Sequence, residues 1–144
     1  MRNQFEIETL RHADPAEKKR LFCLIGEYFA DPDLRRAFGR PMTSTPEYTW
    51  VIAIGDDGEI AGFAGLRVQR NRKAELCHSY TTPAYRGKGF NTWSIQERLR
   101  LAVEQGATEI ITTIKPARAR KYMDVGFVEH GRRGQYAVYT RSLP

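Results

Sequence analysis

One loop organises this sequence: Thr81-Thr82-Pro83-Ala84-Tyr85-Arg86-Gly87-Lys88-Gly89-Phe90-Asn91-Thr92. Before it, Leu76–Thr82 is a β-rich run, and after it the segment from Ile95 to Val103 has helical spacing. The loop therefore leads from a strand into a helix N-terminus, where unpaired N–H groups and the positive end of the helix dipole lie. Glycines let an anion approach that backbone closely. The loop predicts a phosphate or pyrophosphate cradle, to which Arg86 and Lys88 add positive charge.

The spacing in this loop differs from that of the common nucleotide loops. It contains neither the GxxxxGK[ST] of a P-loop nor the GxGxxG of a dinucleotide-binding fold. A plain strand-to-helix turn is the competing interpretation, because a lone G-x-G after a strand occurs there as well.

Length and composition indicate one domain over residues 1–144. No linker or repeat divides the chain, and its 41% hydrophobic and 28% charged residues are typical of a soluble protein. The start, Met1–Leu10, lacks the apolar core of a signal peptide, and no apolar run is long enough to span a bilayer. The 2 cysteines form neither a disulfide framework nor a metal motif. We expect a cytoplasmic protein with no membrane partner and no metal.

The net charge of +6 favours anionic partners. Nucleic acid, an acidic protein and a phosphate-rich cofactor all fit, as does a solvated basic surface without any partner. The basic clusters carry no interleaved aromatic residues, so the sequence lacks an RNA-binding signature.

Local signals predict helices packed on a mostly antiparallel sheet, an α+β architecture. Asp14-Pro15 and Asp31-Pro32 each combine a helix cap with a proline, and Gly39 is expected to end the second helix. A further helix is expected to begin at Pro116 and to stop before Gly126. Strands are expected at 5–10, 48–54, 60–68, 76–82, 109–114, 127–130 and 136–140.

The loop resembles the pyrophosphate-binding loop of the GNAT superfamily of acyl-CoA-dependent N-acyltransferases. Arg86, Gly89 and Asn91 occupy the fixed positions of that family's [QR]-x-x-G-x-[GA] pattern. Asn91 departs from it, and because Asn caps helices we expect an altered start of the helix rather than a lost site. The resemblance implies that acetyl-CoA, or another acyl-CoA, is bound as co-substrate by Tyr80, Thr81, Arg86, Gly87, Lys88, Gly89, Phe90, Asn91 and Thr92.

A second segment, Tyr122-Met123-Asp124-Val125-Gly126-Phe127, resembles the family's Tyr-x-x-x-Gly-Phe. The resemblance implies that Tyr122 lies near the CoA sulfur and protonates the leaving thiolate. Ala117 fits the family's alanine before this tyrosine, whereas Lys115 stands where asparagine is common. The competing interpretation of Tyr122 is a core aromatic residue on a helix.

The family mechanism implies direct attack by an amine, with a backbone N–H near Tyr80 or Thr81 polarising the thioester carbonyl. The attacking ammonium must first lose a proton to a base or a water chain. Glu75 resembles the position of a catalytic carboxylate or histidine in some members, although a solvent-facing strand charge is an equal alternative. Strict alternation places His78 on the opposite face unless a β-bulge shifts the register. Cys77 is interpreted as a buried strand thiol rather than a nucleophile.

These expectations together describe an N-acetyltransferase with a GNAT-like, three-layer fold, namely a mixed, mostly antiparallel sheet with helices on both faces. Its amine acceptor is unidentified, and a homodimer is the default assembly. Two alternatives stay open: acylation of nucleic acid or a nucleic-acid-bound amine, and a non-catalytic acyl-CoA-binding module. The acceptor would lie in an aromatic-lined cleft, or these residues are plain core: Tyr28, Phe29, Phe38, Trp50, His130, Arg132 and Tyr136.

Overall fold

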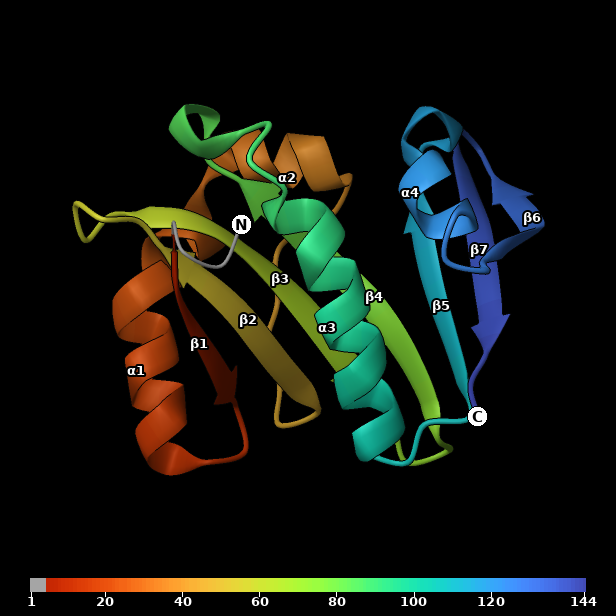
Figure 1. Cartoon of the computed structure of the whole chain (residues 1–144), viewed down its shortest axis with the longest axis horizontal. Helices are drawn as coiled ribbons and strands as arrows, with labels where there is room; N and C mark the ends of the chain where they lie inside the picture. The colour runs from red at the N-terminus through yellow and green to blue at the C-terminus, as the bar shows by residue number, and fades with distance from the viewer. Residues whose placement is uncertain (1–4) are drawn as a thin grey trace.

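A mixed sheet forms the centre of the computed structural model, which describes residues 5–144. Within that range, seven strands pair in the order β1-β2-β3-β4-β5-β7-β6 (Figure 1). Every neighbouring pair is antiparallel except β4 and β5, which are parallel. The strands are β1 Glu6–Arg11, β2 Tyr48–Ile54, β3 Ile60–Val68, β4 Lys73–Thr81, β5 Glu109–Ile114, β6 Val128–Arg133 and β7 Tyr136–Ser142.

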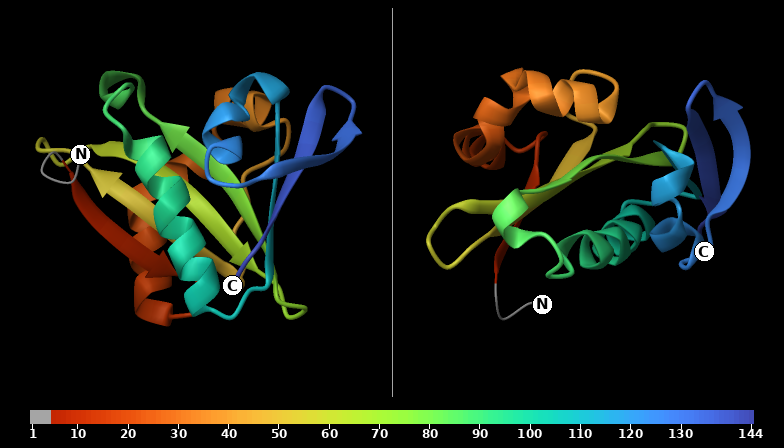
Figure 2. Two further views of the ribbon diagram at one scale, coloured as in Figure 1. Left: turned by 45° about the vertical axis from the view of Figure 1, so that its right-hand side comes forward. Right: turned by 90° about the horizontal axis from the view of Figure 1, so that it is seen from above.

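Helices cover both faces of this sheet. Helices α1 (Pro15–Ile25) and α2 (Pro32–Phe38) lie on one face, and α3 (Phe90–Glu104) and α4 (Arg120–Met123) lie on the other (Figure 2). The predicted α+β, three-layer, mostly antiparallel architecture is therefore confirmed. No helix within residues 5–144 has the length and apolar character needed to cross a membrane.

The predicted helix caps on the α1–α2 face are confirmed. The Asp14 carboxylate accepts hydrogen bonds from the backbone N–H groups of Ala16 and Glu17, both at 3.0 Å. The Asp31 carboxylate likewise accepts hydrogen bonds from the backbone N–H groups of Asp33 and Leu34 at the start of α2. Gly39 ends α2 with a φ of +74°, a left-handed conformation that glycine adopts without strain.

The segment after Pro116 differs from the expected helix. A 3₁₀ helix spans Pro116–Arg118, and α4 that follows has only 4 residues. The backbone N–H of Phe127 bonds to the carbonyl oxygen of Tyr122 at 3.1 Å, which closes the turn early and directs Phe127 into the core. Another 3₁₀ helix, Gly26–Ala30, connects α1 with α2, and the sequence patterns above did not predict it.

Each face of the sheet has its own hydrophobic core. Trp50, Ile52 and Phe63 are fully buried beneath α1 and α2, whereas Phe90 and Ile95 are buried on the α3 face. Burying one such side chain contributes roughly 1.5–3 kcal/mol, so both faces add substantially to stability.

The sheet divides between β4 and β5. These strands pair only where Lys73–Leu76 faces Glu109–Thr112. Beyond that point β4 continues beside β3 as far as Thr81, and β5 continues beside β7 as far as Ile114 (Figure 1). The second half of β4 therefore presents an edge without a strand partner among the described residues, next to the glycine loop.

Candidate functional site

The glycine loop leads directly into the N-terminus of α3. Gly87 and Gly89 have φ values of +79° and +88°, a region that other residues rarely adopt. Gly89 is the N-terminal cap residue of α3, and no side chain among the described residues caps this helix. The first N–H groups of a 15-residue helix are therefore available to an anion. This arrangement fits the pyrophosphate of an acyl-CoA.

One loop residue of the predicted cofactor set, Arg86, fastens the loop to β4. The Nε of Arg86 donates a hydrogen bond to the carbonyl oxygen of Thr81 at 3.1 Å. The Arg86 guanidinium carbon also lies 5.9 Å from the centre of the Tyr80 ring. Lys88 is exposed beside a pocket of about 280 Å³ that Phe5, Asp56 and Tyr85 also line. Both basic side chains are exposed.

Asn91 has a different role from the predicted one. It does not cap α3, because Gly89 holds that position. Its Oδ1 instead accepts a hydrogen bond from the hydroxyl of Ser79 at 2.6 Å, which joins the first turn of α3 to the free edge of β4. Phe90 is buried, so only its backbone can contribute to binding, while Thr92 is exposed.

A β-bulge in β4 interrupts the alternation of side chains. Gly65 pairs with Cys77 and Phe63 pairs with Tyr80, so that two residues of β4, His78 and Ser79, lie opposite one of β3. His78 has a φ of +53°, a strained conformation for a non-glycine residue. Such strain is found most often at functional sites.

The bulge turns His78 towards the α1–α2 face. Its ring stacks on Trp50 at 5.9 Å and 10°, and lies 5.3 Å from Phe38 of α2. Glu75 faces the same side, since it bonds to Arg40 in the segment between α2 and β2. Strict alternation would place His78 and Glu75 on opposite faces, but the β-bulge, the stated exception, shifts the register and brings both to the same face.

His78 is neutral in this structure, and its one hydrogen bond among the described residues is accepted, not donated. Burial, with a smaller effect from Arg40, lowers the pKa of His78 from its usual 6.5 to about 4. The backbone N–H of Thr43 donates to Nε2 at 3.4 Å, so the single ring proton is assigned to Nδ1. Among the described residues Nδ1 has no hydrogen-bond partner. The nitrogen that could accept a proton is engaged, so the geometry does not favour His78 as the general base.

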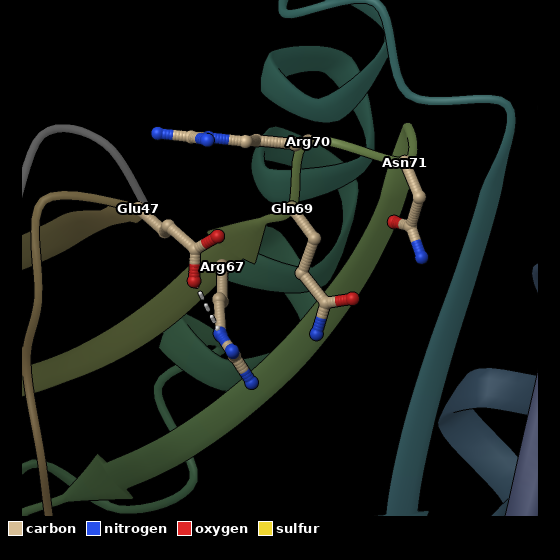
Figure 3. Close-up of a pocket in the computed structure, with 5 residues that line it drawn as sticks. All are labelled: Glu47, Arg67, Gln69, Arg70 and Asn71. Atoms are coloured by element: carbon tan, nitrogen blue, oxygen red, sulfur yellow. Dashed lines mark hydrogen bonds and ion pairs between the residues drawn. The ribbon is translucent and has the colours of Figure 1, made fainter.

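Glu75 belongs to a chain of ion pairs rather than to a bare strand surface. Its carboxylate lies 3.2 Å from Arg40 and 4.0 Å from Arg67, and its side chain is 13% exposed. Arg67 in turn bonds to Glu47 at 2.9 Å (Figure 3). The same figure shows a pocket of about 340 Å³ beside this pair, at the opposite end of β4 from the glycine loop; Gln69, Arg70 and Asn71 complete its lining.

Tyr122 is both a core residue and a polar one. Its side chain is 5% exposed, and its ring meets that of Phe127 edge-on at 5.7 Å. Arg98 of α3, whose side chain is fully buried on the same face, donates hydrogen bonds to the carbonyl oxygens of Gly65 and Ser94. Sequence reasoning missed Arg98, although it lies between Ile95 and Leu99 on the apolar face of a predicted helix, and that position was the available signal.

The remaining expectations concern Cys77 and the acceptor side. Burial raises the pKa of the Cys77 thiol to about 12, so the thiol stays protonated, as expected for a buried strand cysteine. The acceptor-side aromatic residues Tyr28, Phe29, Phe38 and Trp50 pack into the core beneath α1 and α2. His130 and Arg132 are exposed on β6. Tyr136 approaches Gly39, so that the start of β7 meets the end of α2.

Known structures share this fold. The phosphinothricin acetyltransferase of Sinorhizobium meliloti, solved with AcCoA, is 18% identical; the match covers 97% of this chain and 89% of that chain, with a TM-score of 0.67. The spermidine N-acetyltransferase of Vibrio cholerae, solved with CoA and spermine, is 14% identical, with coverage of 97% and 96% and a TM-score of 0.68. A nourseothricin acetyltransferase is 22% identical, with coverage of 73% and 71% and a TM-score of 0.59.

These likenesses establish the fold. No curated protein sequence matches the chain significantly. The sequence profile of the acetyltransferase (GNAT) family matches residues 10–127, most of the chain, and includes the glycine loop, the bulged strand β4 and the Tyr122–Phe127 segment. The chain belongs to the acetyltransferase (GNAT) family.

Proposed function

We propose that this protein is an acyl-CoA-dependent N-acyltransferase that transfers an acetyl group from acetyl-CoA, or the acyl group of a close relative, to an amine. One observation carries the proposal. The uncapped N-terminus of α3, behind Gly87 and Gly89, lies beside the free edge that β4 presents after it separates from β5. An anion cradle next to an unpaired strand edge suits a cofactor that has a pyrophosphate and an extended amide arm.

The proposed cofactor residues divide into two groups. Backbone N–H groups of the loop and of the first turn of α3 bind the pyrophosphate, while Arg86 and Lys88 contribute charge at its mouth. The edge of β4 at Tyr80 and Thr81 bonds the pantetheine arm and polarises the thioester carbonyl. The full proposed set is Tyr80, Thr81, Arg86, Gly87, Lys88, Gly89, Phe90, Asn91 and Thr92.

The proposed chemistry is direct attack by the amine. The hydroxyl of Tyr122 protonates the departing thiolate, and the protonated Cys77 thiol is no candidate for a covalent intermediate. Glu75 is the proposed base for the acceptor ammonium. Its present partner Arg40 has a side chain that is 49% exposed, so an incoming cation can replace that contact without opening the core.

The acceptor is proposed to be an amine of a small molecule. Acetyltransferases with this fold are named for spermidine, phosphinothricin and nourseothricin, which makes these three compounds the first acceptors to test. A cytoplasmic location, a homodimer and a single domain over residues 1–144 stay predictions, as do the alternatives of nucleic-acid acylation and of a non-catalytic acyl-CoA-binding module.

Calorimetric titration with acetyl-CoA, and separately with CoA, tests the cofactor site. We expect micromolar binding that Arg86→Ala weakens and that Arg70→Ala, an exposed arginine at the other end of β4, leaves unchanged. Absence of binding to either ligand would overturn the proposal. Tyr122→Phe then separates an enzyme from a binding module, because an enzyme loses turnover while it still binds CoA.

A matched pair of variants tests the base. We expect Glu75→Gln to lower kcat by roughly 100-fold or more, as for other general bases. Glu47→Gln, which removes a carboxylate from the same chain of ion pairs, should leave kcat nearly unchanged. Equal effects of the two substitutions would assign Glu75 to the ion-pair chain alone.

A further inference from the structure

The glycine loop is fastened to the sheet at its start, whereas the space around its tip is open. The backbone N–H of Thr82 donates to the carbonyl oxygen of Ala61 in β3 at 2.9 Å, and the Thr82 hydroxyl donates to the same oxygen at 3.1 Å. A Cβ built on Gly87 would meet no described residue within 4 Å. Between these two points lies a 3₁₀ helix, Pro83–Tyr85. Besides the Arg86 side chain, Tyr85 is therefore the residue that ties the tip to another part of the fold.

Tyr85 reaches from the loop to the turn between β2 and β3. Its hydroxyl donates a hydrogen bond to Oδ1 of Asp57 at 2.9 Å. The same carboxylate oxygen accepts the backbone N–H of Glu59 at 3.0 Å, so the acceptor is itself held by its turn. The hydrogen bonds from Glu59 and Tyr85 hold the pKa of Asp57 below its usual range, and the carboxylate is therefore ionised at neutral pH. A hydrogen bond to an ionised acceptor is stronger than one between neutral groups.

The same turn leaves space for the Tyr85 ring. A Cβ on Gly55 would lie 2.5 Å from the ring carbon that carries the hydroxyl, and nearer still to the hydroxyl oxygen. Gly55 does not have a positive φ, so glycine is needed here for space rather than for backbone conformation. The ring of Phe5 packs against that of Tyr85 with 5.7 Å between their centres. A hydrogen bond and close packing thus join the same two segments, the loop and the turn.

We infer that Tyr85 is a positioning residue for the proposed cofactor: through Asp57 it holds the glycine loop in the conformation that presents the first N–H groups of α3 to a pyrophosphate. This inference rests on the proposed binding of acyl-CoA. Gly87 and Gly89 give the loop many alternative conformations, and ordering them on binding costs free energy. A loop that is fixed beforehand avoids much of that cost, so binding is tighter. In this role Tyr85 acts through the loop backbone rather than by touching the cofactor.

The charge of Asp57 makes the direction of the effect decisive. Asp57 is an anion beside a site for a negatively charged cofactor, so repulsion alone predicts that its removal strengthens CoA binding. Loss of the hydrogen bond predicts the opposite. Asp56 precedes it in the same turn and lines the pocket beside Tyr85 and Lys88, whereas the Tyr85 hydroxyl bonds to Asp57. Asp56→Ala therefore removes the same charge and leaves the hydrogen bond in place.

The test is calorimetric titration of Tyr85→Phe, Asp57→Ala and the double variant with CoA. We expect each single substitution to raise the Kd by roughly 5- to 10-fold, and the double variant to bind no more weakly than the weaker single one. Asp56→Ala should leave the Kd unchanged or lower it. Gly55→Ala displaces the ring but keeps both polar groups, and it should raise the Kd as Tyr85→Phe does.

Kinetics distinguish positioning of the cofactor from a role in the chemical step. The assay uses acetyl-CoA and whichever of spermidine, phosphinothricin and nourseothricin the wild type acetylates. In Tyr85→Phe the KM for acetyl-CoA should rise in step with the Kd, while kcat at saturation changes by less than about twofold. A fall in kcat without a rise in KM would contradict a role in cofactor binding.

Tyr139→Phe separates positioning from general destabilisation. The hydroxyl of Tyr139 in β7 also bonds to a carboxylate, that of Glu129 at 3.4 Å, so the chemical change is the same at a different place in the fold. We expect this control to lower Tm without raising the Kd for CoA.

Three results would overturn the inference: an unchanged Kd in Tyr85→Phe, additive effects in the double variant, or tighter binding by Asp57→Ala. If Tyr85→Phe does not fold, Asp57→Ala and Gly55→Ala carry the same titration. A wild type that binds neither CoA nor acetyl-CoA refutes the proposed function itself. A wild type that binds CoA, with variants that bind it equally well, refutes only the role of Tyr85.

Discussion

The hydroxyl of Ser79 donates a hydrogen bond to Oδ1 of Asn91 across 2.6 Å, and so fastens the free edge of β4 to the first turn of α3. Asn91 stands where the family pattern has a glycine or alanine. The contact indicates that the larger side chain organises the two halves of the proposed cofactor site, strand edge and helix N-terminus, without blocking the backbone N–H groups.

Asn91→Ala tests this view. We expect the free energy of unfolding to fall by roughly 1 kcal/mol, the usual contribution of such a hydrogen bond, and the affinity for acetyl-CoA to fall by less than about fivefold. Ser79→Ala should behave alike, and the double variant should be no worse than either single one. Calorimetry and urea unfolding measure both quantities. Gln96→Ala, exposed on α3 and outside the proposed cofactor set, is the control. A roughly 100-fold loss of affinity in Asn91→Ala would contradict a role limited to organising the site.

Substitution of two glycines with similar positive φ values, Gly39 and Gly58, distinguishes the cost of backbone strain from the cost of a steric clash. A Cβ on Gly39 would lie 2.4 Å from the hydroxyl of Tyr136, whereas one on Gly58 meets nothing within 4 Å. Both substitutions by alanine carry the strain of a positive φ, roughly 1 kcal/mol. Gly39→Ala should cost roughly 1–3 kcal/mol more, because the Tyr136 ring at the start of β7 must shift away from the end of α2. Urea unfolding of both variants measures the difference. Equal losses of unfolding free energy would show that the Tyr136 side chain moves aside without cost.

Stability should depend on pH through His78. Its pKa is about 4 in the folded protein against an ordinary 6.5, so between these values the unfolded chain binds the extra proton. The free energy of unfolding should therefore fall as the pH drops from 6.5 to 4, by roughly 3 kcal/mol from this group. His12, whose pKa burial also lowers, adds in the same direction.

His78→Asn is the matched variant, because asparagine tolerates the left-handed backbone and does not titrate in this range. Chemical unfolding at a series of pH values should show a shallower slope below pH 6.5 than for the wild type. An unchanged slope would mean that His78 is not held neutral by burial.

The two cysteines should differ sharply in reactivity. Cys23 is exposed, whereas Cys77 is buried with its pKa raised to about 12, so almost no thiolate is present at neutral pH. A disulfide reagent should modify one thiol of the native protein quickly and the second only on unfolding. Cys23→Ser should remove the fast reaction. Rapid modification of that variant under native conditions would contradict the burial of Cys77 and reopen its assignment as a bystander.

Signals confined to a few neighbouring residues predicted much of this fold. The Asp-Pro caps, the glycine loop before α3 and the β-rich runs at 48–54 and 60–68 were sufficient, because a cap or a turn depends on chemistry within one turn of chain. The prediction of a single helix after Pro116 was less accurate, because the end of that helix depends on packing against the rest of the fold. Its helical pattern was sound, but the need to bury Phe127 ended α4 after 4 residues.

The sequence by itself determined the order of elements, the glycine loop at Gly87–Gly89 before α3 and the resemblance that the family profile confirmed. Tertiary structure alone decided which distant side chains come into contact around β4. Pairing with β3 created the bulge that turns His78, chain folding brought Arg40 to Glu75, and packing of α3 on the sheet brought Arg98 to the carbonyl oxygen of Gly65. Each of these contacts joins residues at least 12 positions apart, as Gly65 and Cys77 are. Their proximity depends on the pairing and packing of whole elements, which no local pattern encodes.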